Sequence, residues 1–247
     1  MAVYLISGAT SGLGYDLLKT LSDKSNILII VGRSSTKLNE LATEFKTFDN
    51  YYLNLDLNDV SIFEEQLKLL LEKVGSINGV IHAVGGGLGL KSPILSVPEV
   101  IELLEANLFF SLTINRLILP LFIEKKSGRI IHIGSTAANQ AIGSVGYNVA
   151  KASLDAYVRS LGNYCAQFGV VVCGINPGAF LANNNSMERL KKVNLSAYLN
   201  FESKLPRKRM AKSYEIINII QFLLSDQAEM LGGTMISVDA GEGTSYK

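Results

Sequence analysis

The sequence predicts an α/β fold in which a doubly wound parallel sheet of about seven strands carries helices on both faces. Short apolar runs bounded by glycine alternate with longer amphipathic runs along the chain, which is the pattern of strands buried between layers of helices. The expected strands are residues 3–6, 26–31, 51–55, 79–84, 129–133, 170–175 and 235–238. The expected helices are residues 15–21, 36–45, 61–74, 99–126, 145–168 and 213–224. Right-handed crossovers then gather the loops that follow the strands at one edge of the sheet.

Composition limits the classes of protein that fit this chain. Of its 247 residues, 48% are hydrophobic and 18% are charged, so a large core is expected. No linker, repeat or low-complexity tract stands out, and we predict one domain over residues 1–247. The net charge of +1 favours neither nucleic acid nor an anionic membrane surface as a partner. Cys165 and Cys173 belong to no metal-binding spacing, so neither a disulfide framework nor a metal site is expected.

The N-terminus and the most apolar stretch both favour a soluble cytoplasmic protein. Residues 1–6 run into a glycine turn without a basic stretch, as a first strand does and a signal peptide does not. Glutamate, asparagine and arginine residues interrupt residues 101–123, which therefore fall short of a membrane span.

A glycine-rich turn, Ser7-Gly8-Ala9-Thr10-Ser11-Gly12-Leu13-Gly14, joins the first strand to a helical pattern. Glycines let a backbone approach a pyrophosphate closely, and the start of the helix offers free N–H groups to it. The spacing is G-x-x-x-G-x-G. The turn is a candidate dinucleotide site, and the alternative is an ordinary tight turn.

Arg33 follows the second expected strand, where the adenosine ribose lies in dinucleotide-binding folds. An acidic residue at this place accepts hydrogen bonds from a free 2′-hydroxyl, whereas an arginine suits a 2′-phosphate. Arg33 therefore favours NADP over NAD, and the alternative is a solvated arginine at the start of the next helix.

Tyr147 and Lys151 are four residues apart in the helix expected over residues 145–168 and so share one helical face. A lysine close to a tyrosine favours the phenolate and lowers the pKa of the phenol from about 10 toward neutrality. Such a tyrosine can pass a proton to or from a hydroxyl or carbonyl oxygen. On these two residues alone, an exposed helical pair is the more common explanation.

The helix expected over residues 99–126 is apolar on two sides. One stripe consists of Ile101, Leu104, Leu108 and Leu112, and the other of Leu103, Phe110, Ile114 and Leu117. A helix apolar on two sides packs against the sheet and against a second surface. We expect the second stripe and the stripe Ala150, Leu154, Val158 and Leu161 to contact another subunit. Asn107 lies inside this helix, either as a functional residue or as a hydrogen-bonded core amide.

The motifs occur together in a defined order: Ser7-Gly8-x-x-x-Gly12-x-Gly14, His82-Ala83-Val84-Gly85, Asn107, Ser135, Tyr147-x-x-x-Lys151 and Asn176-Pro177-Gly178. In this order and spacing the chain resembles the classical branch of the short-chain dehydrogenase/reductase family over essentially its whole length. The resemblance implies a Rossmann-type fold. It also implies an NAD(P)-dependent oxidoreductase that interconverts a ketone and a secondary alcohol by hydride transfer, acting as an NADPH-dependent reductase.

The resemblance implies catalytic roles for four residues. Tyr147 would be the general acid in reduction, and Lys151 would lower its pKa and hydrogen-bond the nicotinamide ribose. Ser135 would hold the substrate carbonyl oxygen. Asn107 would fix a helix distortion and a water that links Lys151 to solvent.

The resemblance also implies a binding site for NADP, with NAD as the other possibility. Gly8, Gly12 and Gly14 would line the pyrophosphate, and Thr10, Ser11 and Leu13 lie in the same turn. The remaining cofactor contacts would be Arg33 at the 2′-phosphate, Asp56 and Leu57 at the adenine, Ala83, Val84 and Gly85 beneath the adenosine ribose, and Tyr147, Lys151, Pro177 and Gly178 around the nicotinamide. Ala182 departs from the family, which commonly has a threonine there that binds the carboxamide, so Asn183 substitutes for it or the contact is absent.

Substrate specificity is expected in the loops after the strands, residues 86–98, 139–144 and 179–210. We expect the last to be a polar, irregular lid over a small carbonyl or alcohol substrate. Its basic residues fit an anionic or sugar-like substrate or an acidic carrier protein, and the alternative is a solvated mobile lid. A 3-oxoacyl-carrier-protein reductase is therefore a second hypothesis. A non-catalytic dinucleotide-sensing protein is a third, disfavoured because all four catalytic residues are present. The family also implies a homodimer or homotetramer.

Overall fold

The computed structural model describes residues 2–22 and 26–244. The domain predicted over residues 1–247 therefore extends beyond the described residues at both ends. The predicted α/β class is confirmed, because one parallel sheet has seven strands in the order β3-β2-β1-β4-β5-β6-β9. These strands are β1 (Val3–Ser7), β2 (Ile27–Gly32), β3 (Asn50–Asn54), β4 (Gly79–His82), β5 (Gly128–Ile133), β6 (Val170–Pro177) and β9 (Met235–Val238).

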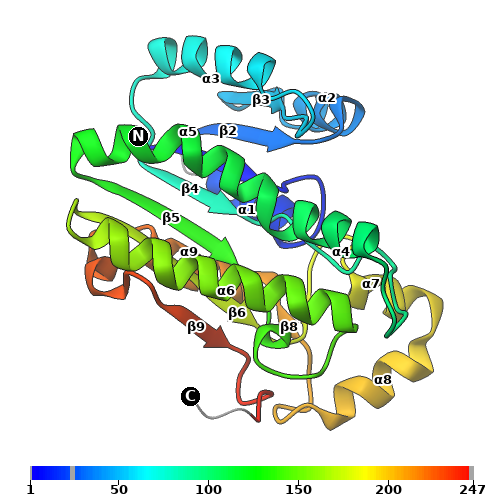
Figure 1. Cartoon of the computed structure of the whole chain (residues 1–247). Coiled ribbons are helices and arrows are strands. Elements are labelled where there is room, and N and C mark those ends of the chain that lie inside the picture. The colour runs from blue at the N-terminus through cyan, green and yellow to red at the C-terminus, as the bar shows by residue number, and fades with distance from the viewer. Residues whose placement is uncertain (1, 23–25, 245–247) are drawn as a thin grey trace.

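Helices cover both faces of this sheet. Figure 1 shows α5 and α6 crossing the near face, with α1 and α9 behind it. The main α-helices are α1 (Gly12–Ser22), α2 (Ser35–Glu44), α3 (Ser61–Val74), α4 (Val97–Leu104), α5 (Phe110–Lys125), α6 (Val145–Ala166) and α9 (Ser213–Leu223). Short 3-10 turns lie at η2 (Thr136–Ala138) and η3 (Asp226–Leu231).

Two apolar cores hold the helices against the sheet, because successive side chains of a strand point to opposite faces. In β1, Leu5 belongs to the core shared with α3, α5 and α6, whereas Ile6 belongs to the core shared with α1, α2 and α9. Ile130 and Ile131 in β5 divide in the same way. All four side chains are fully buried, which explains why the strands are continuous apolar runs.

The prediction that residues 179–210 are irregular is wrong. This segment contains β7 (Phe180–Leu181), α7 (Ser186–Val193) and α8 (Leu195–Lys204), and β7 pairs with β8 (Ala211–Lys212). Asn185 and Asn194 accept hydrogen bonds from backbone N–H groups in the first turns of α7 and α8. Asparagine is a favoured helix cap, and these residues therefore begin helices in a sequence that looks like a polar loop.

The predicted helix 99–126 begins earlier, at Val97, and is not regular. A π-helical turn, η1 (Glu105–Phe109), separates α4 from α5. Within the described residues, the stretch Val97–Lys125 has the length and composition of a membrane span. Phe110, Ile114 and Phe122 of this stretch are buried against the sheet, so we interpret it as a core helix.

The prediction of the subunit-contact stripes is also wrong. Leu103, Phe110 and Ile114 are fully buried within the subunit, as are Ala150 and Val158 of α6. The apolar side chains that face outward on these helices are instead Ile101, Phe109, Leu121, Val145, Val149 and Tyr164. Periodicity reveals two apolar faces of a helix but does not reveal which one meets the sheet.

Candidate active site

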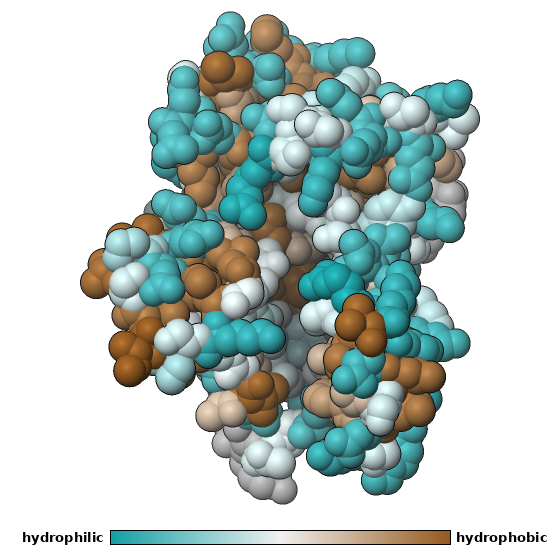
Figure 2. Space-filling model, turned by 90° about the vertical axis from the view of Figure 1, so that its right-hand side faces the viewer, coloured by the Kyte–Doolittle hydropathy of each residue, from teal (hydrophilic) through white to brown (hydrophobic). Residues whose placement is uncertain are grey.

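A large pocket lies at the carboxyl ends of the strands, with a volume of about 1140 Å³. The space-filling view shows a hollow with apolar residues at its base running through this face of the molecule (Figure 2). Most of the predicted site residues line the pocket: Gly8, Thr10, Ser11, Gly12, Leu13, Arg33, Ala83, Val84, Gly85, Ser135, Tyr147, Lys151, Pro177 and Gly178. Gly14, Asp56, Leu57 and Asn107 do not line it.

The glycine turn packs tightly against the loop after β4. Gly8 has a φ of +84°, and a Cβ there would lie 2.6 Å from the backbone of Ala83 and Val84. A Cβ on Gly14 would lie 2.3 Å from the carbonyl oxygen of Gly8. By contrast, a Cβ on Gly12 would meet nothing closer than 4.0 Å. Gly8 and Gly14 are thus required for packing, while Gly12 presents its open side to the pocket.

Arg33 lies at the end of the pocket next to the start of α2, with two neighbours that the sequence analysis missed. Ser34 and Lys37 also line the pocket there, and Ser34 caps α2 by accepting a hydrogen bond from the backbone N–H of Lys37 at 3.4 Å. Lys37 follows Arg33 by four residues, and this spacing could have identified Lys37 from the sequence as a second cation near Arg33. The carboxylate of Asp56 is exposed and lies outside the pocket. It accepts hydrogen bonds from the backbone N–H of Asn58 at 2.9 Å and from the Asn58 side-chain amide at 3.0 Å.

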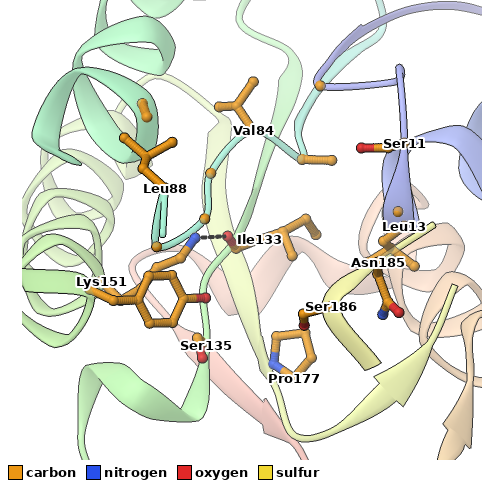
Figure 3. Close-up of a pocket in the computed structure, with 18 of the residues that line it drawn as sticks. Ser11, Leu13, Val84, Leu88, Ile133, Ser135, Lys151, Pro177, Asn185 and Ser186 are labelled. Carbon is orange, nitrogen blue, oxygen red and sulfur yellow. Dashed lines mark hydrogen bonds between the residues drawn. The ribbon is translucent and has the colours of Figure 1, made fainter. Parts of the chain in front are cut away.

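Ser135, Tyr147 and Lys151 meet at the other end of the pocket. Ser135 follows β5, and Tyr147 and Lys151 lie one turn apart on α6. The ammonium of Lys151 lies 5.8 Å from the centre of the Tyr147 ring. It donates a hydrogen bond to the carbonyl oxygen of Ile133 at 3.0 Å (Figure 3). The three side chains that the sequence separates are therefore assembled in one place.

Burial governs the electrostatics of this group. It lowers the pKa of Lys151 from 10.5 to about 8, with the carboxylate of Asp155 opposing the change. Burial also raises the pKa of Tyr147, and a hydrogen bond with Ser135 acts in the opposite direction. The net change in the pKa of Tyr147 is therefore upward, opposite to the expected lowering by Lys151. A low-dielectric site penalises the phenolate and the ammonium alike.

Asn107 lies behind the pocket, within the π-helical turn η1. Its amide donates hydrogen bonds to the carbonyl oxygens of Leu103 at 2.9 Å and Gly86 at 3.0 Å, and it accepts one from the N–H of Gly86 at 3.0 Å. A Cβ on Gly85 would lie 2.5 Å from Asn107 Oδ1 and 3.0 Å from Lys151 Nζ. The loop after β4 is thus clamped between Asn107 and Lys151.

A buried hydrogen-bonded chain positions Ser135. The Asn176 side chain accepts a hydrogen bond from the backbone N–H of Ser135 at 2.8 Å and donates one to the Asp155 carboxylate at 2.8 Å. Asn176 is fully buried and Asp155 is 3% exposed. Asp155 lies one helical turn after Lys151, so the chain connects both predicted catalytic groups. The sequence analysis gave Asp155 no role, although its spacing from Lys151 was visible.

The two histidines form a buried cluster below the pocket. The rings of His82 and His132 stack with 4.6 Å between their centres. Ser7 Oγ lies 2.9 Å from His82 Nδ1, and His82 Nε2 lies 2.9 Å from Asn115 Oδ1. Burial lowers the pKa of His82 to about 4 and that of His132 well below its usual value. Both rings are therefore neutral at neutral pH.

The segment 179–210 approaches the glycine turn. The carbonyl oxygen of Asn183 accepts a hydrogen bond from the N–H of Gly12 at 2.5 Å. Ala182 is buried, and the neighbouring Asn183 does not line the pocket. The side chains of this segment that do line it, none of them identified from sequence, include Phe180, Asn185, Ser186, Met187, Arg189 and Phe201.

A doubly wound sheet with a glycine turn, and a serine, tyrosine and lysine above it, defines a dinucleotide-dependent oxidoreductase. The family model described as short chain dehydrogenase matches residues 2–193. The chain belongs to this family, whose members bind NAD or NADP.

Named relatives and solved structures agree with this assignment. The chain is 29% identical over 244 residues to a 3-oxoacyl-[acyl-carrier-protein] reductase of Buchnera aphidicola, covering 96% of this chain and 95% of the relative. It is 26% identical to an L-xylulose reductase of Caenorhabditis elegans, covering 96% and 94%. A solved structure of an actinorhodin polyketide ketoreductase with NADPH has a similar fold, with a TM-score of 0.87, 20% identity and coverage of 99% and 98%. The protein is an oxidoreductase that acts on CH–OH and C=O groups.

Proposed function

We propose that the protein is an NADPH-dependent reductase that converts a ketone to a secondary alcohol. One observation carries the proposal: a single pocket has Ser135, Tyr147 and Lys151 at one end and the cations of Arg33 and Lys37 at the other. Among the described residues that line this pocket, Glu242 is the only carboxylate, and it lies outside the Arg33 end because it accepts a hydrogen bond from the N–H of Ala179. The adenosine end thus suits a phosphate better than a free 2′-hydroxyl.

The residues present fit a bound dinucleotide. The open side of Gly12 and the backbone of Ser11 and Leu13 face the pocket and suit a pyrophosphate. Pro177 and Gly178 then border the nicotinamide. When bound, NADPH supplies the hydride. The ketoreductase with NADPH and the two relatives named as reductases support this direction of reaction.

Each catalytic side chain has a defined task in this proposal. The Ser135 hydroxyl holds the carbonyl oxygen of the substrate, and the Tyr147 phenol donates its proton to that oxygen. The ammonium of Lys151, 5.8 Å from the ring centre, stabilises the phenolate that remains. Asn107 holds the loop at Gly85 and Gly86 against Lys151.

The test is a fluorescence titration with NADPH and NADH on wild type and Arg33→Ala. We expect NADPH to bind more tightly, and the variant to lose roughly 10- to 150-fold in NADPH affinity, the equivalent of one charge-assisted hydrogen-bonding group at about 1.5–3 kcal/mol. Arg116→Ala is the matched control, because Arg116 is exposed and outside the pocket. Equal affinities for the two cofactors, unchanged by Arg33→Ala, would contradict the NADP assignment.

A 3-oxoacyl-carrier-protein reductase is the second candidate. The 29% identity to such an enzyme over nearly the whole of both chains favours it. The outer surface of the segment 179–210 carries exposed lysines that suit an acidic carrier, namely Lys191, Lys192, Lys204 and Lys208. A kcat/KM for acetoacetyl carrier protein at least tenfold above that for the free thioester would favour this candidate, and equal values would remove it.

We propose also that the chain forms one domain, with residues 179–210 as the substrate lid, and that the enzyme is a cytoplasmic homodimer or homotetramer. The outward apolar face of α4, α5 and α6 suits a subunit contact, since Ile101, Phe109, Leu121 and Val149 are between 37% and 45% exposed. Sedimentation as a monomer at micromolar concentration would contradict the oligomer.

A further inference from the structure

Most of the basic residues of the segment 179–210 do not face the pocket. Arg207 and Arg209 form ion pairs with Glu215, at 3.0 and 2.7 Å. Lys192 pairs with Glu188 at 3.3 Å, and Lys191 lies over the ring of Tyr198. None of these four cations lines the large pocket, whereas Lys91 and Arg189 do. The guanidinium of Arg189 donates a hydrogen bond to the carbonyl oxygen of Asn184. Most of the positive charge that the sequence suggested for an anionic or sugar-like substrate is therefore directed elsewhere.

Apolar side chains surround the catalytic end of the pocket. The loops after β4 and β5 flank Tyr147, because a Cβ on Gly87 or on Gly143 would lie 3.9 or 2.9 Å from the Tyr147 side chain. The next residue along the first loop is Leu88, which lines the pocket with 41% of its surface exposed, and Ile142 precedes Gly143 with 57% exposed. Figure 3 shows Leu88 on the same side of the pocket as Lys151.

The segment 179–210 contributes apolar groups from the opposite side. Met187 and Phe201 line the pocket, and both pack against the small core of Tyr198, Leu205 and Met210. Leu88 and Ile142 leave apolar surface open to water at this end of the pocket, which is unfavourable unless a ligand covers it.

Several polar side chains that line the pocket are already engaged in hydrogen bonds within the protein. Ser144 accepts a hydrogen bond from the backbone N–H of Tyr147 at 3.4 Å, and Glu242 accepts one from that of Ala179 at 2.6 Å. Asn185 bonds to the backbone of Glu188 and Phe180. A polyhydroxylated substrate needs a partner for each buried hydroxyl, and Ser135 and Tyr147 together serve a single oxygen.

We propose that the substrate is a ketone with a large apolar substituent, such as a medium-chain alkyl or alicyclic ketone, rather than a sugar or a small oxo acid. This inference rests on the proposed reductase function and narrows its substrate class. The carbonyl oxygen lies between Ser135 and Tyr147, and the alkyl substituent occupies the space bounded by Leu88, Ile142 and Met187.

The experiment measures kcat/KM with NADPH for a series of 2-alkanones from 2-butanone to 2-octanone, and for xylulose and pyruvate. We expect kcat/KM to rise roughly threefold to fourfold for each added methylene until the pocket is filled, and to be lowest for xylulose and pyruvate. Met187→Gln should lower kcat/KM for 2-octanone about tenfold and leave the affinity for NADPH unchanged. Met230→Gln is the matched control, because Met230 is 94% exposed and outside the pocket.

The outcomes separate this inference from the proposed function. Preference for xylulose or pyruvate overturns the substrate class and keeps the reductase. Flat kcat/KM along the 2-alkanone series, or no reduction of any compound while NADPH still binds, also overturns the class. Failure of NADPH to bind instead refutes the proposed function, and the titration with Arg33→Ala detects this separately.

Discussion

Lys151→Met should abolish activity and at the same time stabilise the folded protein at neutral pH. The Lys151 side chain is 3% exposed and donates a hydrogen bond to the carbonyl oxygen of Ile133 at 3.0 Å. Methionine has a similar length, carries no charge and adapts to an irregular apolar space. The substitution therefore removes the ammonium while keeping most of the packing.

The size of the effect follows from the burial of the ammonium. Burial lowers the pKa of Lys151 from 10.5 to about 8, and each tenfold change in the ionisation constant is worth about 1.4 kcal/mol. The charged form therefore costs the folded state about 3 kcal/mol at pH 7. Losing the hydrogen bond to Ile133 costs about 1 kcal/mol in return. The net gain is about 2 kcal/mol, which raises Tm by about 4–8 °C in a chain of this size.

The pH dependence of stability provides a second measurement. Because the pKa of Lys151 is lower in the folded state (about 8) than in the unfolded state, near 10.5, the unfolded state holds more protons between these values. Wild-type stability therefore rises with pH in this range, and the advantage of Lys151→Met shrinks.

Urea unfolding of the cofactor-free protein at pH 7 and pH 9.5 measures both effects. Lys68→Met is the matched control, since Lys68 is exposed on α3, and it should change stability little at either pH. The reasoning is refuted if Lys151→Met is no more stable than wild type at pH 7, or if its advantage is the same at pH 9.5.

Three further predictions test the surroundings of the site. Asn176→Ala removes the acceptor for the Ser135 N–H and the partner of Asp155, so kcat should fall about 10- to 100-fold while the affinity for NADPH holds; an unchanged kcat would show that this chain does not position Ser135. The wild-type protein should lose up to about 3 kcal/mol of stability as the pH falls from 6.5 to 4, because the pKa of His82 is about 4 in the folded state and the unfolded state binds the proton first. In urea unfolding, the stability of His82→Gln should depend less on pH over this range. An equal pH dependence would show that His82 is not the group responsible. Val149→Glu places a charge on the outward apolar face of α6, where Val149 is 45% exposed, and should convert the oligomer to monomers in sedimentation, whereas a stable variant oligomer would locate the contact elsewhere.

Features that depend on neighbouring residues were predictable from the sequence. The strands appear as apolar runs because both faces of the sheet are covered. The glycine turn is visible because Gly8 and Gly14 leave no room for a Cβ. Tyr147 and Lys151 meet because four residues make about one helical turn. In each case the backbone within a few residues is sufficient to place the groups.

Tertiary packing decided the rest. Two apolar stripes of α4 and α5 have the same periodicity, and only the position of the sheet determines that Phe110 is buried and Ile101 exposed. Asp155, Asn176 and Ser135 are distant in sequence and meet because α6, β6 and the end of β5 pack together. Burial likewise reversed the expected change in the pKa of Tyr147. Such contacts form between elements that are far apart in the chain, and they remove the buried groups from water. Both effects depend on the three-dimensional arrangement, so the local sequence pattern does not predict them.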